Sequence, residues 1–304
     1  MFKHAYLLVA NANFRVVEAC LRMIDDPRND IYLLLDAKSK VSEEQKNRFS
    51  ACVSQSTLTF SEQIVNWGGW SQISAVLSLL KQANHADCDY SYVHFLQGSD
   101  LPIRSQDEIH AFFEANQGKE FVQIEKNRTS MAQRKAWYRH FFCHSRFFRT
   151  GKPIKALNFG LMELQKLLHI RKNTDIELYQ GSALFSITGA CAQYIESRER
   201  EIHKRFYLSL AADEVFLQSM LMASPFRESI AGVDREVSEN ARLIDRTRPD
   251  GKNSPHIWRA EEADAILHAN PDKMFARKFD EKMDFAIVET ICKEVASHEP
   301  TVGP

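Results

Sequence analysis

The first half of the chain alternates between apolar runs and amphipathic stretches. Residues 4–10 (HAYLLVA) and 31–35 (IYLLL) are near-continuous apolar runs, which are typical of parallel strands covered on both faces. Between these runs, apolar residues recur at helical spacing over 14–24, and Asp25-Asp-Pro27 ends the helix. A strand, a helix and a second strand predict a right-handed βαβ unit.

The same pattern continues to the end of the chain and predicts an α/β fold with a mainly parallel sheet flanked by helices. In the first half it predicts a polar helix over 42–50, a strand at 58–60, a long helix opened by 66–71, a strand at 92–96, a helix over 105–115 and a strand near 120–124. In the second half it predicts a strand within 178–188, helices from about 190 and over 213–222, a strand at 242–245, a helix over 261–267, a strand within 274–280 and a final helix.

Composition fits one globular domain over 1–304, since 44% of the residues are apolar and 26% are charged. We expect a nucleotide-binding half over 1–125, a basic aromatic segment over 126–170 and a catalytic, acceptor-binding half over 171–300. The formal net charge of -1 argues against nucleic acid as a partner. Six scattered cysteines, a chain start without an apolar leader and the lack of a long apolar run favour a cytoplasmic protein.

The stretch after residues 92–96 is the first candidate site. Gly98 permits a tight turn, Ser99 and Asp100 offer oxygens, and Pro102 prevents the strand from continuing. Open α/β sheets bind nucleotides at such turns, although an ordinary strand-to-helix turn has the same pattern. Asp100 stands alone where a metal motif would have two carboxylates, so we expect no metal here. Asp87-Cys-Asp89 has the two-aspartate spacing but precedes its strand, so it is rejected.

Acidic and basic side chains form two further candidate groups. Asp213 and Glu214 begin an apolar helix, where they either only complement the helix dipole or provide a general base. Lys278, beside Arg277, either is solvated or neutralises a diphosphate without a metal. Three more cations lie on the loop 246–256 and are candidates for a flap over phosphates, namely Arg246, Arg248 and Lys252. The sequence contains no GxSxG, Walker or zinc-ligand spacing, which leaves hydrolase and NTPase functions without support.

Residues 126–162 contain nine Lys or Arg and no Asp or Glu, interleaved with seven aromatic residues. One interpretation is a solvated helical excursion with its aromatic side chains packed beneath it. The alternatives are a docking face for an acidic acceptor and a docking face for an anionic membrane surface.

Eight short motifs follow one another along the chain: HAYLLVA, IYLLLDAKS, VNWGGWSQ, LQGSDLPI, GSALFSIT, ADEVFLQSM, SPHIW and FARKFD. Together and in this order they resemble the core-2/I-branching β-1,6-N-acetylglucosaminyltransferases and their relatives, the peptide O-xylosyltransferases. The resemblance runs from His4 to about Ile291. The chain departs from the family's pattern at Ala212, where proline is frequent, and no residue is a certain match for the arginine that helps to bind the diphosphate.

The resemblance implies a GT-A-like glycosyltransferase fold with a Rossmann-like, mainly parallel (mixed) sheet. It implies inverting, metal-independent transfer of a sugar from a UDP-sugar to a hydroxyl, with no other cofactor. Glu214 would be the catalytic base, Lys278 would contact the diphosphate and Asp36 would bind the nucleoside. GlcNAc is the expected sugar, although no residue selects it over xylose or another sugar. The alternative is an inactive relative that binds a nucleotide or a sugar.

These expectations define two sets of site residues and a set of partners. The donor-binding set is Ala10, Asn11, Asp36, Lys38, Trp67, Gly98, Ser99, Asp100, Lys278, Arg277, Arg248 and Lys252. The acceptor-binding set is Gly181, Ser182, Asp213, Arg134 and Trp137. The expected partners are a UDP-sugar, a glycan or lipid-linked saccharide acceptor and an anionic membrane surface. The short chain resembles bacterial members that build surface polysaccharide or lipooligosaccharide, so we expect it at the inner face of the cytoplasmic membrane.

Overall fold

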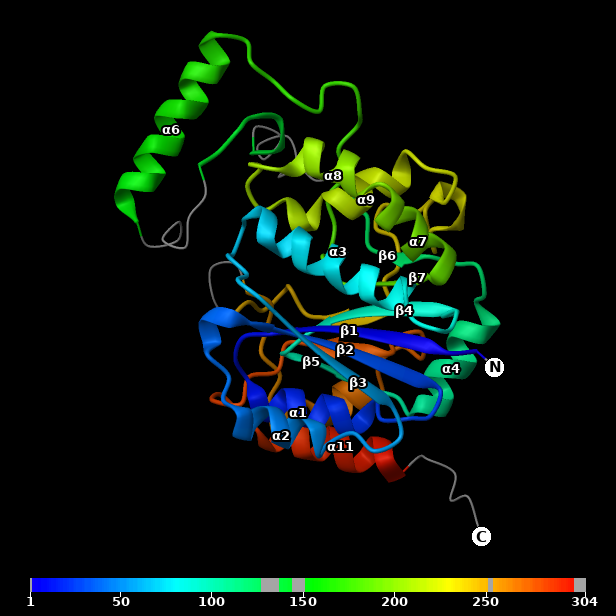
Figure 1. The fold of residues 1–304 in the computed structure, drawn as a ribbon. Coiled ribbons are helices and arrows are strands. Elements are labelled where there is room, and N and C mark those ends of the chain that lie inside the picture. Colours follow the sequence, from blue (N-terminus) through cyan, green and yellow to red (C-terminus); the bar gives the residue numbers. More distant parts are fainter. Residues whose placement is uncertain (1, 127–136, 144–150, 251–253, 298–304) are drawn as a thin grey trace. The chain divides into compact units, whose positions relative to one another are not determined.

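The computed structural model describes residues 2–126, 137–143, 151–250 and 254–297 (Figure 1). These residues form two compact units. The first unit comprises Met1–Glu62, Asp89–Gln117 and Ala241–Pro304, and the second comprises Gln63–Cys88 and Gly118–Asn240. Each unit therefore combines segments that are far apart in the sequence, and the predicted single domain over 1–304 stays a prediction.

The first unit is built on four strands in the order β3-β2-β1-β4. They are β1 (His4–Ala10), β2 (Asn29–Asp36), β3 (Thr57–Gln63) and β4 (Tyr92–Gln97). β1 is parallel to both β2 and β4. All residues of β2, and all of β1 except Val9, are buried, as the unbroken apolar runs predicted. The α/β class with a mainly parallel sheet is confirmed.

Helices of the first unit flank this sheet. α1 (Phe14–Met23), α2 (Glu43–Ser50) and α11 (Ala286–Ser297) lie side by side on one face (Figure 1). α4 (Gln106–Ala115) begins with the predicted capping box, in which the Ser105 hydroxyl accepts from the Glu108 N–H and the Glu108 carboxylate accepts from the Ser105 N–H. The short α10 (Ala263–Leu267) matches the predicted helix over 261–267.

A second, three-stranded sheet completes the first unit. It contains β5 (Asp100–Pro102), β9 (Phe275–Arg277) and β8 (Arg242–Ile244) in the order β5-β9-β8. β4 ends at Gln97 as predicted, but the residues after the turn form a strand that the sequence did not predict. Pro102 is tolerated in β5 because β5 lies at the edge of its sheet, where a missing N–H removes no ladder hydrogen bond.

The second unit is mainly helical. Among the described residues its helices include α3 (Trp70–Asn84), α6 (Lys152–Leu167), α7 (Gly189–Ser197), α8 (Glu199–Phe206) and α9 (Phe216–Met222). β6 (Phe121–Val122) pairs antiparallel with β7 (Phe185–Thr188), and both strands are shorter than predicted. None of the helices within the described ranges combines the length and the apolar character that crossing a bilayer requires.

The predicted helix over 213–222 is wrong in its first turn. Residues Ala212–Glu214 form a separate 3-10 turn, and α9 begins only at Phe216. Val215 interrupts the helix with φ -134, and Ala211 before the turn is left-handed with φ 50. The acid pair therefore lies on its own turn. The sequence also missed α8, which follows α7 with a break of one residue.

Three histidines form a buried cluster in the first unit. His94 Nε2 lies 3.1 Å from His4 Nδ1, and the rings of His4 and His110 stack with centroids 3.9 Å apart. His110 Nε2 lies 2.9 Å from Asn29 Oδ1. Burial, reinforced by nearby positive charge, lowers the pKa of His4 to about 2 and that of His110 to about 4, and it lowers the pKa of His94 too.

These lowered pKa values predict acid instability. Above about pH 6.5 the histidines are neutral in both states, and below it the unfolded chain binds protons that the folded cluster rejects. Stability should therefore fall as the pH falls from about 6.5 toward 4, by up to about 1.4 kcal/mol per pH unit for each histidine. In His110→Gln, urea-unfolding midpoints should depend less steeply on pH, while any loss of packing should show equally at pH 8. An unchanged pH dependence in this variant would contradict the assignment.

Candidate functional site

The carboxyl ends of β1, β2 and β4 meet at one edge of the first unit's sheet. In the parallel register Ala10 lies opposite Leu35, the residue before Asp36, and Val9 lies opposite Gln97. The loops that follow these strands therefore leave from the same edge. Asn11 is exposed directly after β1. This edge is where α/β sheets bind nucleotides.

The loops after β1 and β2 are tied to each other. Asp36 is 4% exposed and caps the short turn Ala37–Ser39, because its Oδ1 accepts from the Lys38 N–H at 3.1 Å. The Lys38 ammonium lies 3.4 Å from Asp36 Oδ2. The Ser39 hydroxyl donates to the Asn11 carbonyl at 2.7 Å. Asp36 and Lys38 therefore lie together at the edge as an ion pair, with Lys38 on the exposed side.

Gly98 packs closely against the loop after β1 and the first turn of α1. A Cβ at this position would lie 3.1 Å from a Val17 methyl group and 3.3 Å from the Ala12 carbonyl oxygen. Its N–H donates to the Val9 carbonyl at 3.0 Å. The turn after β4 is thus held against the end of β1, and a larger residue would push the two loops apart.

Asp100 and Arg277, both predicted to bind the donor, bond to each other. Asp100 is 1% exposed, and its Oδ1 accepts from the Arg277 guanidinium. Its Oδ2 accepts from the Gln97 N–H at 2.8 Å, and Arg277 Nη2 also donates to Gln97 Oε1 at 2.8 Å. This network joins the turn after β4 to β9. Ser99 belongs to the same junction, because its carbonyl accepts from the Phe279 N–H at 2.9 Å.

The backbone around Lys278 is fixed by the SPHIW motif. The Trp258 N–H donates to the Lys278 carbonyl and the Trp258 indole N–H donates to the Arg277 carbonyl, each at 3.0 Å. The motifs LQGSDLPI, SPHIW and FARKFD therefore converge in the first unit although they are up to 180 residues apart. Lys278 itself is half-buried. Its main chain is held on both sides, which suits a cation that must occupy one place.

The flap loop is only partly described. Arg248 is exposed and forms ion pairs with Asp245 at 2.8 Å and with Glu262 at 2.9 Å. Hydrogen bonds from Thr247, together with the Arg248 guanidinium, lower the pKa of Asp245. Lys252 lies outside the described residues, as does Arg134 of the acceptor-binding set. The predicted contacts of Arg248 and Lys252 with a donor stay predictions.

In the second unit, Gln72 joins the acid turn to the WGG loop. Its Nε2 donates to Asp213 Oδ2 at 3.0 Å, and its Oε1 accepts from the Gly68 N–H. The Ala211 N–H donates to the Gly68 carbonyl at 2.7 Å. The loop that carries Trp67, which is 46% exposed, is thus anchored beside the acid turn. Sequence reasoning missed Gln72, although it is the last residue of the VNWGGWSQ motif.

The two acids of the turn differ in their surroundings. Burial and the adjacent charge of Glu214 raise the pKa of Asp213 to about 7. One carboxylate oxygen of Glu214 accepts from Gln180 Nε2 at 3.2 Å, and its carbonyl accepts from the Gly181 N–H at 2.9 Å. Near neutral pH, Asp213 is therefore partly protonated beside a half-buried carboxylate that an amide orients. This arrangement suits a general base.

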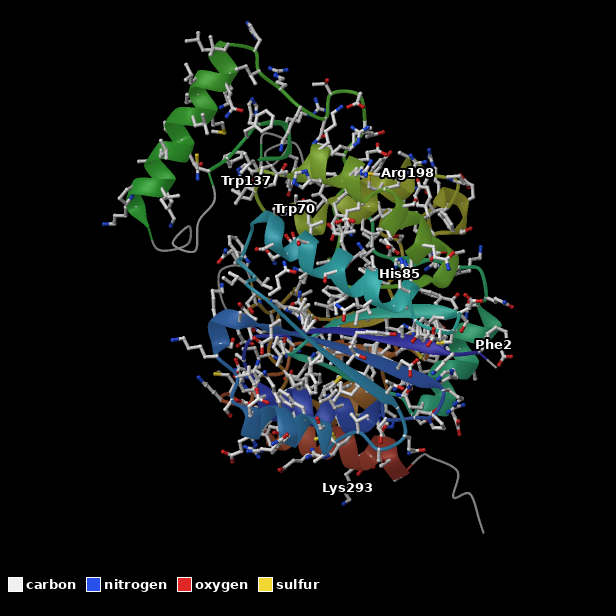
Figure 2. All side chains as sticks on the ribbon, in the orientation of Figure 1. Phe2, Trp70, His85, Trp137, Arg198 and Lys293 are labelled. Carbon is white, nitrogen blue, oxygen red and sulfur yellow. The ribbon has the colours of Figure 1, made fainter. Side chains whose placement is uncertain are left out.

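The other predicted acceptor residues lie mostly inside the second unit. Gly181 has no room for a side chain, because a Cβ would lie 1.6 Å from the Gln123 carbonyl oxygen. Ser182 is 3% exposed, and its hydroxyl accepts from the Leu184 N–H at 3.2 Å. Trp137 is half-buried at the start of the described stretch 137–143 (Figure 2). Gly181 and Ser182 thus build the turn beside Glu214, and their contact with an acceptor stays a prediction.

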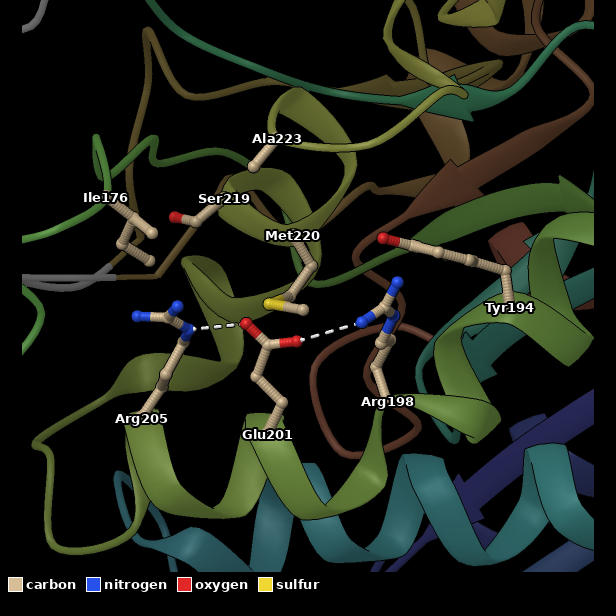
Figure 3. A pocket seen from close by; sticks show the side chains of 8 residues that line it. All are labelled: Ile176, Tyr194, Arg198, Glu201, Arg205, Ser219, Met220 and Ala223. Atoms are coloured by element: carbon tan, nitrogen blue, oxygen red, sulfur yellow. Dashed lines mark hydrogen bonds and ion pairs between the residues drawn. The ribbon is translucent and has the colours of Figure 1, made fainter.

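A separate hollow of about 130 Å³ lies in the second unit (Figure 3). Its lining is Ile176, Tyr194, Arg198, Glu201, Arg205, Ser219, Met220 and Ala223. Glu201 pairs with Arg205 at 2.9 Å and with Arg198 at 3.5 Å, so both guanidinium groups already have a negative partner. The hollow does not include Asp213 or Glu214, so it is not the candidate site. Within the described residues, no three His, Cys, Asp or Glu side chains are grouped as metal ligands.

The first unit is an α/β structure with polar loops at the carboxyl ends of its parallel strands, the edge at which sheets of this type commonly bind nucleotides. A sequence comparison identifies the family. The chain belongs to the Core-2/I-Branching enzyme family, whose sequence model matches residues 4–265. This is a family of glycosyltransferases.

Individual relatives agree with this membership. "Xylosyltransferase sqv-6" of Caenorhabditis elegans is 23% identical over 309 residues, which cover 94% of this chain and 36% of the relative. The mouse "Beta-1,3-galactosyl-O-glycosyl-glycoprotein beta-1,6-N-acetylglucosaminyltransferase 4" is 20% identical over 317 residues, covering 98% and 66%. The chain thus spans about a third and about two thirds of these two relatives.

A solved structure, mouse xyloside xylosyltransferase 1 in its apo form, covers 91% of this chain and 97% of its own, with 8% identity and a TM-score of 0.42.

The network around Asp100 predicts a loss of stability when its charge is removed. Asp100→Asn leaves the Arg277 guanidinium facing a neutral amide in a largely buried position, which should cost about 3 kcal/mol. The urea-unfolding midpoint should fall accordingly, and adding Arg277→Gln should restore part of it. Glu43→Gln is the control in the same unit, because it removes an exposed ion pair with Lys46 and should leave the midpoint unchanged. Equal effects of Asp100→Asn and Glu43→Gln would contradict the structural role of Asp100.

Proposed function

We propose that this protein is an inverting glycosyltransferase that moves a sugar from a UDP-sugar to a hydroxyl group of a saccharide acceptor. Membership of the Core-2/I-Branching enzyme family supports the reaction class. The printed names of the relatives, a xylosyltransferase and an N-acetylglucosaminyltransferase, support GlcNAc or xylose as the sugar. The observation that carries the proposal is the oriented Glu214 carboxylate beside an acid with a raised pKa.

In the proposed reaction the first unit binds the donor. Asp36 and the loop after β1 bind the nucleoside at the sheet edge, within a GT-A-like fold. Lys278 places its positive charge on the diphosphate and stabilises the negative charge that develops as UDP leaves. No metal is needed for this step, because the fixed cation of the chain replaces it.

Glu214 of the second unit acts on the acceptor. It takes the proton from the acceptor hydroxyl as that oxygen bonds to the anomeric carbon of the sugar. The bond from this carbon to the diphosphate oxygen breaks at the same time, and UDP leaves with the bonding electrons. A single displacement of this kind inverts the anomeric configuration. Below about pH 7 Asp213 is mostly protonated, which reduces the negative charge beside Glu214.

The acceptor and the setting complete the proposal. We infer that the acceptor is a glycan or a lipid-linked saccharide in bacterial surface polysaccharide or lipooligosaccharide synthesis. The transfer would take place in the cytoplasm, where the protein would make peripheral contact with an anionic membrane. The basic composition of residues 126–162 supports this contact.

A donor screen in excess EDTA tests both the reaction and its independence of metal. The purified protein is given UDP-GlcNAc, UDP-xylose and other UDP-sugars with saccharide acceptors, and UDP release is measured. We expect acceptor-dependent release with one of these donors, and we expect EDTA to leave the rate unchanged. Loss of activity in EDTA with rescue by Mn²⁺ would contradict metal independence. Failure of all UDP-sugars while another class of nucleotide sugar reacts would contradict the donor assignment.

Two substitutions should separate the roles of the two units. Glu214→Gln keeps the size of the side chain but removes the base, so turnover should fall by about 10²–10⁴-fold while UDP-sugar binding is retained. Lys278→Ala should weaken UDP binding and slow transfer together. The measurements are initial rates and calorimetric titration with UDP. Near-normal turnover of Glu214→Gln would exclude Glu214 as the base, and normal UDP binding by Lys278→Ala would exclude the diphosphate contact.

A further inference from the structure

Helix α6 (Lys152–Leu167) buries two polar side chains and exposes much of its apolar surface. Its two buried residues are polar, since Asn158 is 5% and Gln165 is 4% exposed. Ile154, Leu161 and Met162 are half-buried, and the other large apolar side chains are exposed. On and directly after the helix these are Leu157 at 58%, Phe159 at 65%, Leu164 at 51%, Leu167 at 75%, Leu168 at 57% and Ile170 at 43%.

The two buried amides explain why the helix takes this orientation. Asn158 accepts from the Cys143 N–H at 2.7 Å and donates to the Cys143 carbonyl at 2.8 Å. Gln165 accepts from the Phe141 N–H at 2.8 Å and donates to the Phe141 carbonyl at 2.9 Å. The two residues are seven apart and therefore lie on one face of the helix. Paired bonds to the main chain of 141–143 thus dock the helix by the face that carries these two amides.

A stripe of leucines results from this docking. Leu157 and Leu164 are seven residues apart, and Leu168 follows four residues later, so the three lie along one side of the helix axis. All three are more than half exposed. Exposed apolar side chains that gather in one place usually mark a binding surface, whereas single ones need no explanation.

The surroundings of the leucine stripe are basic. In the described residues 137–143 and 151–172 there is one acid, Glu163, and there are six basic residues: Arg139, Lys152, Lys155, Lys166, Arg171 and Lys172. This formal charge of +5 lies in a chain whose formal net charge is -1. Lys152, Lys155 and Arg171 are exposed. A partner for this surface therefore needs an apolar region that can bury the leucine side chains, and it needs negative charge beside that region.

We propose that α6 docks the protein on an anionic lipid bilayer. The helix, about 24 Å long, lies in the plane of the interface with its leucine stripe in the acyl boundary and its lysines among the headgroups. Anionic lipids supply the negative charge, and the acyl chains supply the apolar depth. A second copy of the chain fits less well, because a symmetric contact through α6 would bring two basic surfaces together. The proposal does not depend on the transfer reaction.

Vesicle cosedimentation tests this inference. At low salt the full chain should bind vesicles of phosphatidylglycerol and phosphatidylcholine in equal parts, and it should bind phosphatidylcholine vesicles much more weakly. Binding should fall as salt shortens the screening length to about 8 Å. The variant Leu157→Gln, Leu164→Gln, Leu168→Gln should lose at least about 10-fold in partitioning, because glutamine keeps helix propensity but removes the inserted side chains of the leucine stripe.

A matched variant controls for the loss of exposed apolar surface. Ile64→Gln, Val237→Gln, Met283→Gln removes three side chains elsewhere that are 56%, 44% and 54% exposed, and it should bind vesicles like the wild type. The charge variant Lys152→Gln, Lys155→Gln, Arg171→Gln should lose about 100-fold at low salt, since each cation near the surface contributes roughly a factor of 5. Vesicle binding by the charge variant should also depend less on salt concentration.

Three outcomes would overturn the proposal. The first is that the wild type does not bind anionic vesicles at low salt. The second is that the leucine variant binds them as well as the matched Ile64, Val237 and Met283 variant. The third is that sedimentation velocity shows an oligomer that the leucine substitutions dissociate. The last result would assign the stripe to a second copy. UDP binding, measured in parallel, should be the same in all variants. If even the wild type fails to bind UDP, that result counts against the proposed reaction and not against membrane docking.

Discussion

The pairing of β1 with parallel neighbours on both sides is the constraint on which the first unit depends. β1 lies between β2 and β4, and its register brings the ends of all three strands to one edge. The buried side chains of β1 leave no freedom to shift this register, because a slip by one residue would reverse every side chain. The loops that carry Asn11, Asp36 and Gly98 therefore leave from the same edge, and further contacts only refine their places.

The acidic side chains at the candidate sites in the two units are stabilised in different ways. In the first unit, the buried Asp100 is matched by Arg277, which joins β5 to β9 and leaves Lys278 as the next cation along the chain. In the second unit, Asp213 and Glu214 are neighbours in the sequence. Burial and the charge of Glu214 raise the pKa of Asp213, so Asp213 is only partly charged at neutral pH. Gln72 and Gln180 then fix one acid each. A cation paired with a carboxylate suits binding, whereas two adjacent acids, one of them with a raised pKa, suit proton transfer.

The sequence predicted those features that depend on local pattern. Unbroken apolar runs identified β1, β2 and β4, and the Ser105–Glu108 spacing identified the start of α4, because burial and capping leave a local signature. Features that depend on distant partners were missed. The bond from Gln72 to Asp213 joins residues 141 positions apart, and neither residue alone indicates it. The burial of Asn158 and Gln165 on α6 was missed for the same reason, because their hydrogen-bond partners lie on the main chain of 141–143.

Hydrogen exchange with and without UDP tests most directly that the sheet edge of the first unit is the nucleotide site. Saturating UDP should slow amide exchange in the loops after β1, β2 and β4, over residues 11–13, 37–40 and 98–100, and around Lys278. Exchange in β6 and β7 of the second unit should stay the same. Protection confined to the second unit, or no protection at any of these loops under saturating UDP, would contradict the account.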